Sequence, residues 1–323
     1  MFTKKQSINL LKDGDSVDDI FVVKIKKSIM PYKGGMKFGF MLVLSDSSGA
    51  SLEYKYWGGE DEEKVKEVHN TINEDSVIAI KGVVSTFNGK LQVCADDMSY
   101  LKVLDSSEYD ADFVPVAKRD LDEMELELKT VMASIVNEQL RRLLALIFDE
   151  TLMKKFKTHP GAIQIHHNWI GGLMQHTLEI ISLCETCIKL NPSLDRDLLL
   201  TGAILHDIGK LEELEVTSRI KGSRKGQLVG HLTLGVVLVS QKLDEVGVDE
   251  LLKEKLLHLI TSHHGKLEYG SPKTPMMPEA FALYYADELS SKLSEIVQFV
   301  EEKKVSTEDN FMYHNRNGNI LLR

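Results

Sequence analysis

The hydrophobic pattern of this 323-residue chain changes its period once, near residue 119, and that change most constrains the fold. Before it, apolar and polar residues alternate over short runs such as 50–57, a period of two that is typical of half-buried β-strands. After it, apolar residues recur three and four apart, which is typical of amphipathic helices. The sequence therefore predicts a β-rich domain followed by an all-helical one.

The first 105 residues predict a small barrel. Asn88-Gly89, between the last two predicted strands, is a strong signal for a hairpin turn. Five strands with a helix between the third and the fourth is the order of an OB-fold barrel, so we predict an all-β OB-fold domain over 1–105. The expected strands cover 20–29, 38–46, 50–57, 76–87 and 90–95, and the expected helix covers 58–72.

The rest of the chain predicts a linker, a helical domain and a tail. Residues 106–118 are polar with one proline, as expected of a linker. Residues 119–303 predict an all-α domain, in which one helix carries the doublet His206-Asp207 near its centre. Residues 304–323 are polar, so this C-terminal tail either is disordered or docks on a neighbour, and of the two we expect disorder.

Composition narrows the class of protein. No apolar run is long enough for a signal peptide or a membrane span, and the three cysteines are too few for a disulfide framework, which predicts a soluble cytoplasmic protein with no membrane partner. The net charge of −10 argues against a protein that coats nucleic acid through overall positive charge. Any nucleic-acid binding must therefore depend on local patches.

A set of histidines and aspartates predicts a metal site in the helical domain. Imidazole and carboxylate groups are the ligands that hold Mn, Fe, Co, Ni or Zn. One ion needs about four protein ligands, so seven suggest two ions that share a carboxylate. The seven residues, which fall on successive predicted helices or their ends, are His176, His206, Asp207, His231, His263, His264 and Asp287.

Asp207 and Lys210 are the predicted catalytic residues. A carboxylate has two oxygens, whereas a neutral imidazole offers one lone pair, so Asp207 is the natural bridge between two ions. Lys210 follows His206 by four residues and Asp207 by three, which places its ammonium on the same side of a helix. We expect it to meet a phosphate.

The order of these residues resembles the metal-binding signature of the HD superfamily of phosphohydrolases, over about residues 160–290. His231 and His263-His264 resemble the additional positions of its two-metal members, some of which cleave cyclic dinucleotides. The Gly-Tyr-Pro stretch of that group is replaced here by "GQLVGH" (226–231), which counts against cyclic dinucleotides.

Over nearly the whole chain the sequence is similar to the YhaM-type 3′-5′ exoribonuclease family. The resemblance rests on an OB-fold ahead of the HD domain and on the segments "HHNWIGGLMQHTLE", "AILHDIGKL", "ITSHHG" and "ALYYADELSSKL". It implies manganese-dependent removal of nucleotides from RNA 3′ ends, giving nucleoside 5′-monophosphates. By the family's pattern one ion would be held by His176, His206, Asp207 and Asp287, and the other by Asp207, His231, His263 and His264.

Basic and aromatic residues predict where single-stranded RNA is held. Lysines along a strand attract the phosphate backbone, and rings stack under the bases. The same pairing can serve single-stranded DNA, and the helical domain adds a basic loop before His231 that either holds phosphates or is ordinarily solvated. The predicted nucleic-acid contacts are Lys26, Tyr32, Lys33, Lys37 and Trp57 in the first domain and Arg224 and Lys225 in the second.

Two other functions stay open at this point. One is a phosphohydrolase of a small nucleotide, such as an alarmone or a cyclic dinucleotide, although a small substrate needs no strand-holding module. The other is a non-catalytic nucleic-acid-binding regulator, against which the complete set of ligands argues. A homo-oligomer is compatible with each of these functions.

Overall fold

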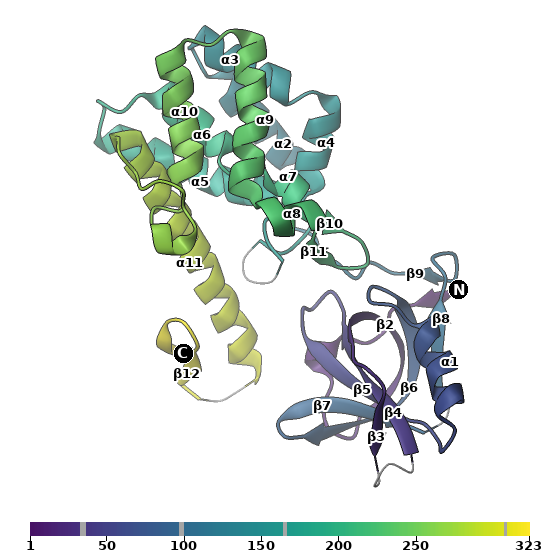
Figure 1. Ribbon diagram of the computed structural model, residues 1–323. Helices are drawn as coiled ribbons and strands as arrows, with labels where there is room; N and C mark the ends of the chain where they lie inside the picture. Colours follow the sequence, from purple (N-terminus) through teal and green to yellow (C-terminus); the bar gives the residue numbers. More distant parts are fainter. Residues whose placement is uncertain (33–36, 97–99, 164–166, 307–308) are drawn as a thin grey trace. The chain divides into compact units, whose positions relative to one another are not determined.

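The computed structural model divides the chain into two compact units (Figure 1). The first unit comprises Met1–Pro115 together with Val216–Ile220, and the helical unit comprises Val116–Glu215 and Lys221–Arg323. The structure describes residues 1–32, 37–96, 100–163, 167–306 and 309–323.

The first unit is built on one highly paired sheet. The run Ser16–Lys26 is rich in apolar and β-branched residues, which favours a long strand. Asn88 and Gly89, both with positive φ, turn the chain between two later strands as the sequence predicts. The elements are β1 (Phe2–Thr3), β2 (Ser16–Lys26), β3 (Met30–Tyr32), β4 (Lys37–Ser45), β5 (Ser51–Trp57), α1 (Glu62–Thr71), β6 (Val77–Phe87), β7 (Lys90–Ala95), β8 (Leu101–Leu104) and β9 (Tyr109–Asp110).

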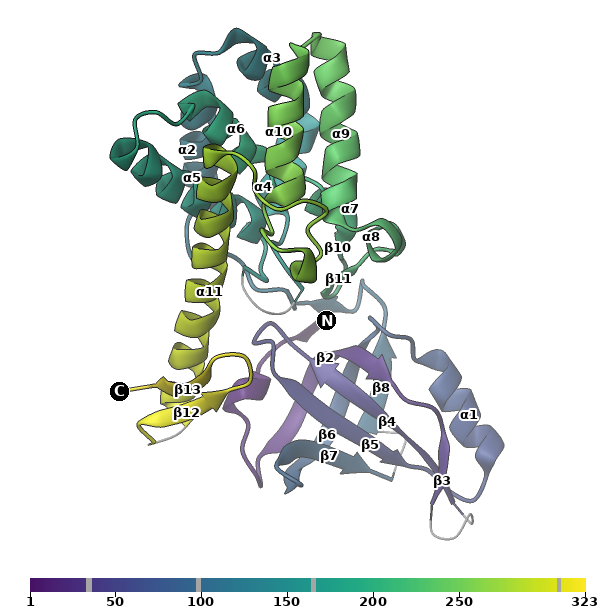
Figure 2. The same ribbon diagram turned by 60° about the vertical axis from the view of Figure 1, so that its left-hand side comes forward.

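The strand pairings of the first unit return to their starting point. They run β2-β4-β5-β7-β6, and β6 pairs again with β2, from Val83 opposite Ser16 to Val77 opposite Val22. All these pairings are antiparallel except that of β5 with β7. Apolar residues inside the circuit, among them Phe21, Leu42 and Tyr54, are buried in one cluster, and Val65 of α1 packs onto it. Figure 2 shows the same strands from a second direction.

A buried ion pair fastens the N-terminus to this sheet. Lys4 Nζ lies 3.1 Å from Asp19 Oδ2 and 3.7 Å from Asp46 Oδ2. Asp19 also accepts hydrogen bonds from the backbone N–H groups of Lys5 and Gln6, at 3.0 and 2.6 Å. Both carboxylates are buried, so each depends on these partners for its stability.

The helical unit gathers its helices around one large apolar core, which contains residues of α2 to α7 and of α9 to α11. Its helices are α2 (Leu121–Ala133), α3 (Glu138–Ile147), α4 (Glu150–Thr158), α5 (Gly172–Leu190), α6 (Arg196–Leu205), α7 (Lys210–Glu213), α8 (Arg224–Val229), α9 (His231–Val246), α10 (Glu250–Ser262) and α11 (Pro278–Ser306), and its last strands are β12 (Phe311–His314) and β13 (Gly318–Leu321). The short strands β10 (Leu214–Val216) and β11 (Ile220–Gly222) are divided between the two units, since Val216 and Ile220 belong to the first. None of the described helices is long and apolar enough to cross a bilayer.

Side-chain caps set the starts of several helices. The apolar pattern over 120–150 is divided between α2 and α3 because Asn137 caps the second helix, accepting from the backbone N–H groups of Gln139 and Leu140. Asp195 caps α6 in the same way through Leu198. Such caps fix the residue at which each helix begins.

The expected disorder of the tail 304–323 is wrong for the part that the structure describes. β12 and β13 form an antiparallel hairpin, with Phe311 opposite Leu321. His314 Nε2 lies 3.3 Å from a carboxylate oxygen of Glu295 on α11, and Leu322 is buried. An apolar residue near the chain end and a turn at Gly318, whose φ is positive, allow this polar segment to fold. The predicted linker is also partly ordered, since Phe113 is buried.

We predict that Asp19→Ala destabilises the first unit by about 3 kcal/mol, because it leaves the Lys4 ammonium without its nearest carboxylate and the backbone N–H groups of Lys5 and Gln6 without their acceptor. Asp18→Ala is the matched control, since Asp18 pairs with Lys81 at the surface and its loss should change stability by less than about 0.5 kcal/mol. Urea unfolding followed by circular dichroism measures both, and equal midpoints for the two variants would contradict the account.

Candidate metal centre

The structure brings all seven predicted metal-binding residues together in the helical unit. His176 lies on α5, His231 begins α9, and Asp287 lies on α11. His263 and His264 directly follow α10. Ligand atoms of these residues lie within 4.8 Å of one another in overlapping groups of three.

The sequence pattern predicted that His206 and Asp207 lie near the centre of a helix, and this prediction is wrong. α6 ends at Leu205, His206 is its C-terminal cap, and Asp207 lies in the turn that leads to α7. Gly209 in this turn allows a close approach, because a Cβ there would lie 2.0 Å from the backbone oxygen of His231. The turn therefore packs directly against the start of α9, which carries His231.

Each of the five histidines is held through its Nδ1 atom. His206 Nδ1 lies 2.8 Å from the backbone oxygen of Ala203, and His263 Nδ1 lies 2.8 Å from that of Ile260. A carbonyl oxygen only accepts, so each Nδ1 carries the proton and each Nε2 keeps a lone pair. His264 Nδ1 is held likewise, 3.2 Å from the backbone oxygen of Tyr269.

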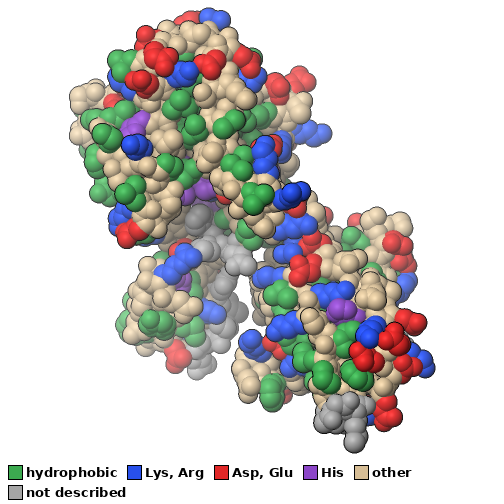
Figure 3. Space-filling view, in the orientation of Figure 1, with side chains coloured by type: hydrophobic (Ala, Val, Ile, Leu, Met, Phe, Trp, Pro, Cys, Tyr) green, Lys and Arg blue, Asp and Glu red, His purple; other side chains and the backbone are tan. Residues whose placement is uncertain are grey.

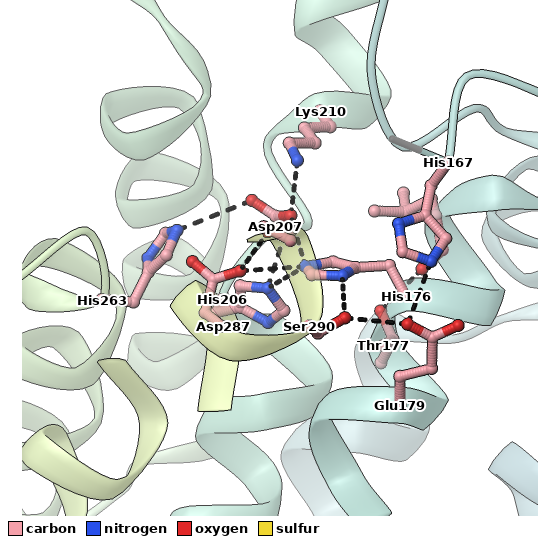
Figure 4. A network of polar contacts seen from close by, with 12 residues as sticks. His167, His176, Thr177, Glu179, His206, Asp207, Lys210, His263, Asp287 and Ser290 are labelled. Carbon is pink, nitrogen blue, oxygen red and sulfur yellow. Dashed lines mark hydrogen bonds and ion pairs between the residues drawn. The ribbon is translucent and has the colours of Figure 1, made fainter. Parts of the chain in front are cut away.

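The Nδ1 atoms of the other two histidines, His231 and His176, are held by side chains. His231 Nδ1 lies 2.9 and 3.0 Å from the two carboxylate oxygens of Glu213. His176 Nδ1 lies 3.4 Å from Ser290 Oγ, and this hydroxyl donates to Glu179 Oε2 at 2.8 Å (Figure 4). Because the Ser290 proton is directed to Glu179, its oxygen accepts from His176 Nδ1. All five Nε2 atoms are thereby left as lone-pair donors.

The two carboxylate oxygens of Asp207 face different histidines. Oδ2 lies 3.3 Å from His206 Nε2 and 3.6 Å from His176 Nε2. Oδ1 lies 3.6 Å from His263 Nε2 and 3.7 Å from His231 Nε2. Asp287 and His264 join these groups, with Asp287 Oδ1 3.1 Å from His176 Nε2 and His264 Nε2 3.2 Å from His231 Nε2.

We call the residues on the Oδ2 side the His176 set and those on the Oδ1 side the His231 set. The His176 set is His176, His206 and Asp287, and the His231 set is His231, His263 and His264. Asp207 belongs to both.

Closely spaced acceptors in this centre fit bound cations. The Nε2 atoms of His206 and His176 face each other at 3.3 Å, and those of His231 and His264 at 3.2 Å. Two lone pairs at that distance repel unless a cation lies between them. Asp207 Oδ1 and His263 Nε2 are buried and have no hydrogen-bond partner among the described residues. A buried acceptor left in this way indicates an ion, and imidazole with carboxylate is a donor set for a divalent transition metal.

The local electrostatics favour the metal-binding form of Asp207 and His264. Burial acts to raise the pKa of Asp207, but the charge of Lys210 and the contact with His206 hold it well below its usual value. Burial, together with His263 and His231, lowers the pKa of His264 to about 4. A metal competes with protons for these atoms, so an ionised carboxylate and a neutral imidazole favour binding.

Lys210 lies at this centre with its ammonium beside Asp207, as predicted, although it begins the next helix, α7, and does not continue α6. Its Nζ lies 2.6 Å from Asp207 Oδ2. Its backbone oxygen accepts from the buried His159 Nε2 at 2.9 Å, and burial lowers the pKa of His159 to about 4. The sequence around His159 does not predict a partner for it. In the structure its hydrogen bond holds the backbone of Lys210, whose ammonium lies beside Asp207.

The residues that support the ligands have no signal in the sequence. Glu213 lies 18 residues before His231, and Ser290 lies 114 residues after His176, so no local spacing links them. His167, buried beside His176, donates from Nε2 to Glu179 Oε2 at 3.0 Å. Only the tertiary fold brings these pairs together.

The predicted nucleic-acid contacts are divided between the two units. In the first unit the ring centroids of Tyr32 and Trp57 lie 4.8 Å apart. Tyr32 on β3 lies directly opposite Lys37 on β4. Lys26 donates from Nζ to the backbone oxygen of Ile72 at 2.7 Å, and Lys33 lies outside the described residues.

In the helical unit Arg224 and Lys225 begin α8, where Lys225 lies 3.2 Å from Glu212. Figure 3 shows basic and acidic side chains interspersed on the visible surface of each unit, so the basic patches are local.

Comparisons with known proteins agree with this centre. Residues 173–292 match the model of the HD domain. The chain is 31% identical over 317 residues to the 3′-5′ exoribonuclease YhaM of Bacillus subtilis (strain 168), covering 96% of each protein. It is 30% identical over 292 residues to the 3′-5′ exoribonuclease YhaM of Geobacillus sp. (strain WCH70), covering 90% of this chain and 87% of that one.

Among solved structures the chain is similar to the HD domain of the L. monocytogenes phosphodiesterase PgpH. The TM-score is 0.31 at 17% identity, covering 49% of this chain and 83% of that one. A likeness this weak carries no argument about function.

We predict that Mn²⁺ at about 100 times its dissociation constant stabilises the helical unit by about 2.7 kcal/mol for each bound ion. The melting temperature should then rise by roughly 5–10 °C per ion in a unit of this size. Asp207→Asn should remove most of this rise, whereas Asp244→Asn, at the exposed end of α9, should keep it. Calorimetric scans with Mn²⁺ and with a chelator measure the difference, and no rise in the unsubstituted chain would argue against a metal centre.

Proposed function

The chain belongs to the family of the 3′-5′ exoribonuclease YhaM, and from this premise we propose that it degrades single-stranded RNA from its 3′ end. The proposed reaction is hydrolysis of the terminal phosphodiester bond with two divalent ions, giving nucleoside 5′-monophosphates. Support comes from relatives at 30–31% identity over 90–96% of the chain, and from the HD domain match over residues 173–292.

The position of Asp207 carries the proposal. One oxygen faces the Nε2 atoms of His176 and His206, and the other faces those of His231 and His263, as a carboxylate shared by two ions requires. We propose that the His176 set with Asp207 Oδ2 holds one ion and that the His231 set with Asp207 Oδ1 holds the other. This donor set suits several transition metals, of which we propose Mn²⁺, with Fe, Co, Ni and Zn as the alternatives.

Bound divalent cations would supply positive charge that neutralises the phosphodiester oxygens and the leaving oxygen. The protein's own contribution is positional. Lys210, which burial does not neutralise because Asp207 raises its pKa, holds one further positive charge beside the same carboxylate. We propose that this ammonium binds a substrate phosphate oxygen. The Nδ1 contacts keep the ligands in place throughout, so little reorganisation is needed during the reaction.

We propose that the first unit is an OB-type barrel that holds the strand. Two observations support this: its strand pairings close on themselves through β2 and β6, and α1 lies between β5 and β6 in the chain. In this proposal residues 1–105 hold RNA, 106–118 connect, 119–303 cleave, and 304–323 form a tail. Tyr32, Lys37 and Trp57, which lie together at one end of β3, β4 and β5, would contact bases and backbone.

Several narrower expectations stay predictions. These are single-stranded DNA as a second substrate, a homo-oligomeric assembly, a cytoplasmic location, and RNA contacts by Lys26, Lys33, Arg224 and Lys225.

We predict that Asp207→Ala lowers cleavage of 5′-labelled single-stranded RNA by at least about 10³-fold, because charge stabilisation by metal ions is worth several kcal/mol. Helical content and RNA binding should persist in this variant, and Asp244→Ala should cleave normally. Stepwise shortening that requires Mn²⁺ supports the proposed reaction, whereas a shifted but uncut RNA supports a binding regulator. RNA that is neither cut nor shifted supports a small-nucleotide substrate, and full turnover by Asp207→Ala would remove the metal mechanism.

We predict that changing Lys33 and Lys37 together to Ala weakens RNA capture and lowers the slope of log affinity against log salt by about 1.4, at about 0.7 for each phosphate that is no longer bound. Cleavage of very short RNA should change little. Changing Lys64 and Lys66 on α1 to Ala removes the same charge from a helix that is not predicted to contact RNA. Filter binding at several salt concentrations measures the slopes, and identical slopes for the two double variants would refute the assignment.

A further inference from the structure

One histidine in each set is held by a carboxylate, while the others are held by backbone carbonyls. In the His231 set the carboxylate is Glu213, in direct contact with His231 Nδ1. In the His176 set it is Glu179, which reaches His176 through the hydroxyl of Ser290. This distribution gives each set one outer carboxylate.

We propose that Glu213 and Glu179 are positioning residues that each tune the affinity of one metal ion, Glu213 for the ion of the His231 set and Glu179 for the ion of the His176 set. The inference rests on the proposed two-metal function. It adds that the two ions are controlled separately, by carboxylates that bind neither of them.

Glu213 is itself held rigidly. It ends α7, and its carboxylate also accepts from the backbone N–H of His231 at 3.0 Å. Its backbone oxygen accepts from Ser223 at 2.8 Å, and Gly226 packs so closely that a Cβ there would lie 2.3 Å from that oxygen. A fixed anion at Nδ1 sets the orientation and tautomer of an imidazole and makes its Nε2 a stronger donor to a metal.

Glu179 is held by a larger network on α5 and the segment before it (Figure 4). Its Oε2 accepts from Ser290 and from His167, and its Oε1 accepts from Gln175 Nε2 at 3.1 Å. Gln175 in turn accepts from Trp169 Nε1 at 3.2 Å. Because Glu179 acts on His176 through an intervening hydroxyl, its effect should be smaller than that of Glu213.

The separation of the two effects follows from Asp207. His231 lies on the Oδ1 side of this carboxylate and His176 on the Oδ2 side, so a change at one histidine first alters the ion on its own side. Each glutamate should therefore couple to the ligands of its own set and not to those of the other set.

The test is calorimetric titration of Mn²⁺ into the metal-free, full-length chain, in which we expect two binding events. His264→Ala identifies the event of the His231 set, and Asp287→Asn identifies that of the His176 set. Glu213→Gln should weaken the first event by about 10–100-fold, and Glu179→Gln should weaken the second by about 10-fold. Ser290→Ala, which breaks the relay and leaves Glu179 in place, should weaken the same event as Glu179→Gln.

Matched controls remove a nearby carboxylate that contacts no ligand. Glu212→Gln alters a residue that pairs with Lys155 and Lys225, and Glu185→Gln alters one that pairs with Arg196 on the outside of α5. Both should bind two ions with unchanged affinity. Circular dichroism of each variant checks that the helical unit is folded.

The inference is overturned if Glu213→Gln and Glu179→Gln weaken the same event, or if neither weakens any. Fewer than two bound ions in an unsubstituted chain that degrades RNA would also overturn it and would leave the exonuclease proposal standing. Failure of the unsubstituted chain to degrade RNA, with the two events assigned as expected, would overturn the proposed function and leave the inference intact.

Discussion

The helical unit holds a group of mutually repelling hydrogen-bond acceptors at its centre. Five imidazoles present their Nε2 lone pairs to one another and to two carboxylates, with His206 and His176 only 3.3 Å apart at these atoms. Such a group of acceptors is unfavourable in a buried place unless positive charge lies among them. Lys210 supplies one such charge, beside Asp207. The remaining acceptors are what makes the centre suitable for divalent cations.

The fold keeps these acceptors together because it holds the Nδ1 atom of each imidazole ring with a hydrogen bond. His206 and His263 are turned by carbonyls that the ends of α6 and α10 leave without helical partners. A helix C-terminus followed by a turn thus has a chemical role, since it exposes a carbonyl to hold Nδ1 and directs Nε2 inward. Gly209 then allows α9 to approach the turn, so that His231 meets Asp207.

The residue pattern was sufficient to predict which side chains meet, because ligands on successive helices share a recognisable order. It also predicted the division into a β-rich and a helical part, since the apolar period changes from two to three and four. It placed His206 and Asp207 inside a helix, however, because the apolar spacing continues across the turn that follows Leu205. The tail hairpin was missed because its order depends on contacts with α11, such as that of His314 with Glu295.

Anomalous diffraction at the manganese absorption edge, from crystals grown with Mn²⁺, would locate bound ions directly. We expect two peaks, one beside each carboxylate oxygen of Asp207, with His231, His263 and His264 on one and His176, His206 and Asp287 on the other. A map with no peak at Asp207, or with these imidazoles directed to separate places, would contradict this expectation.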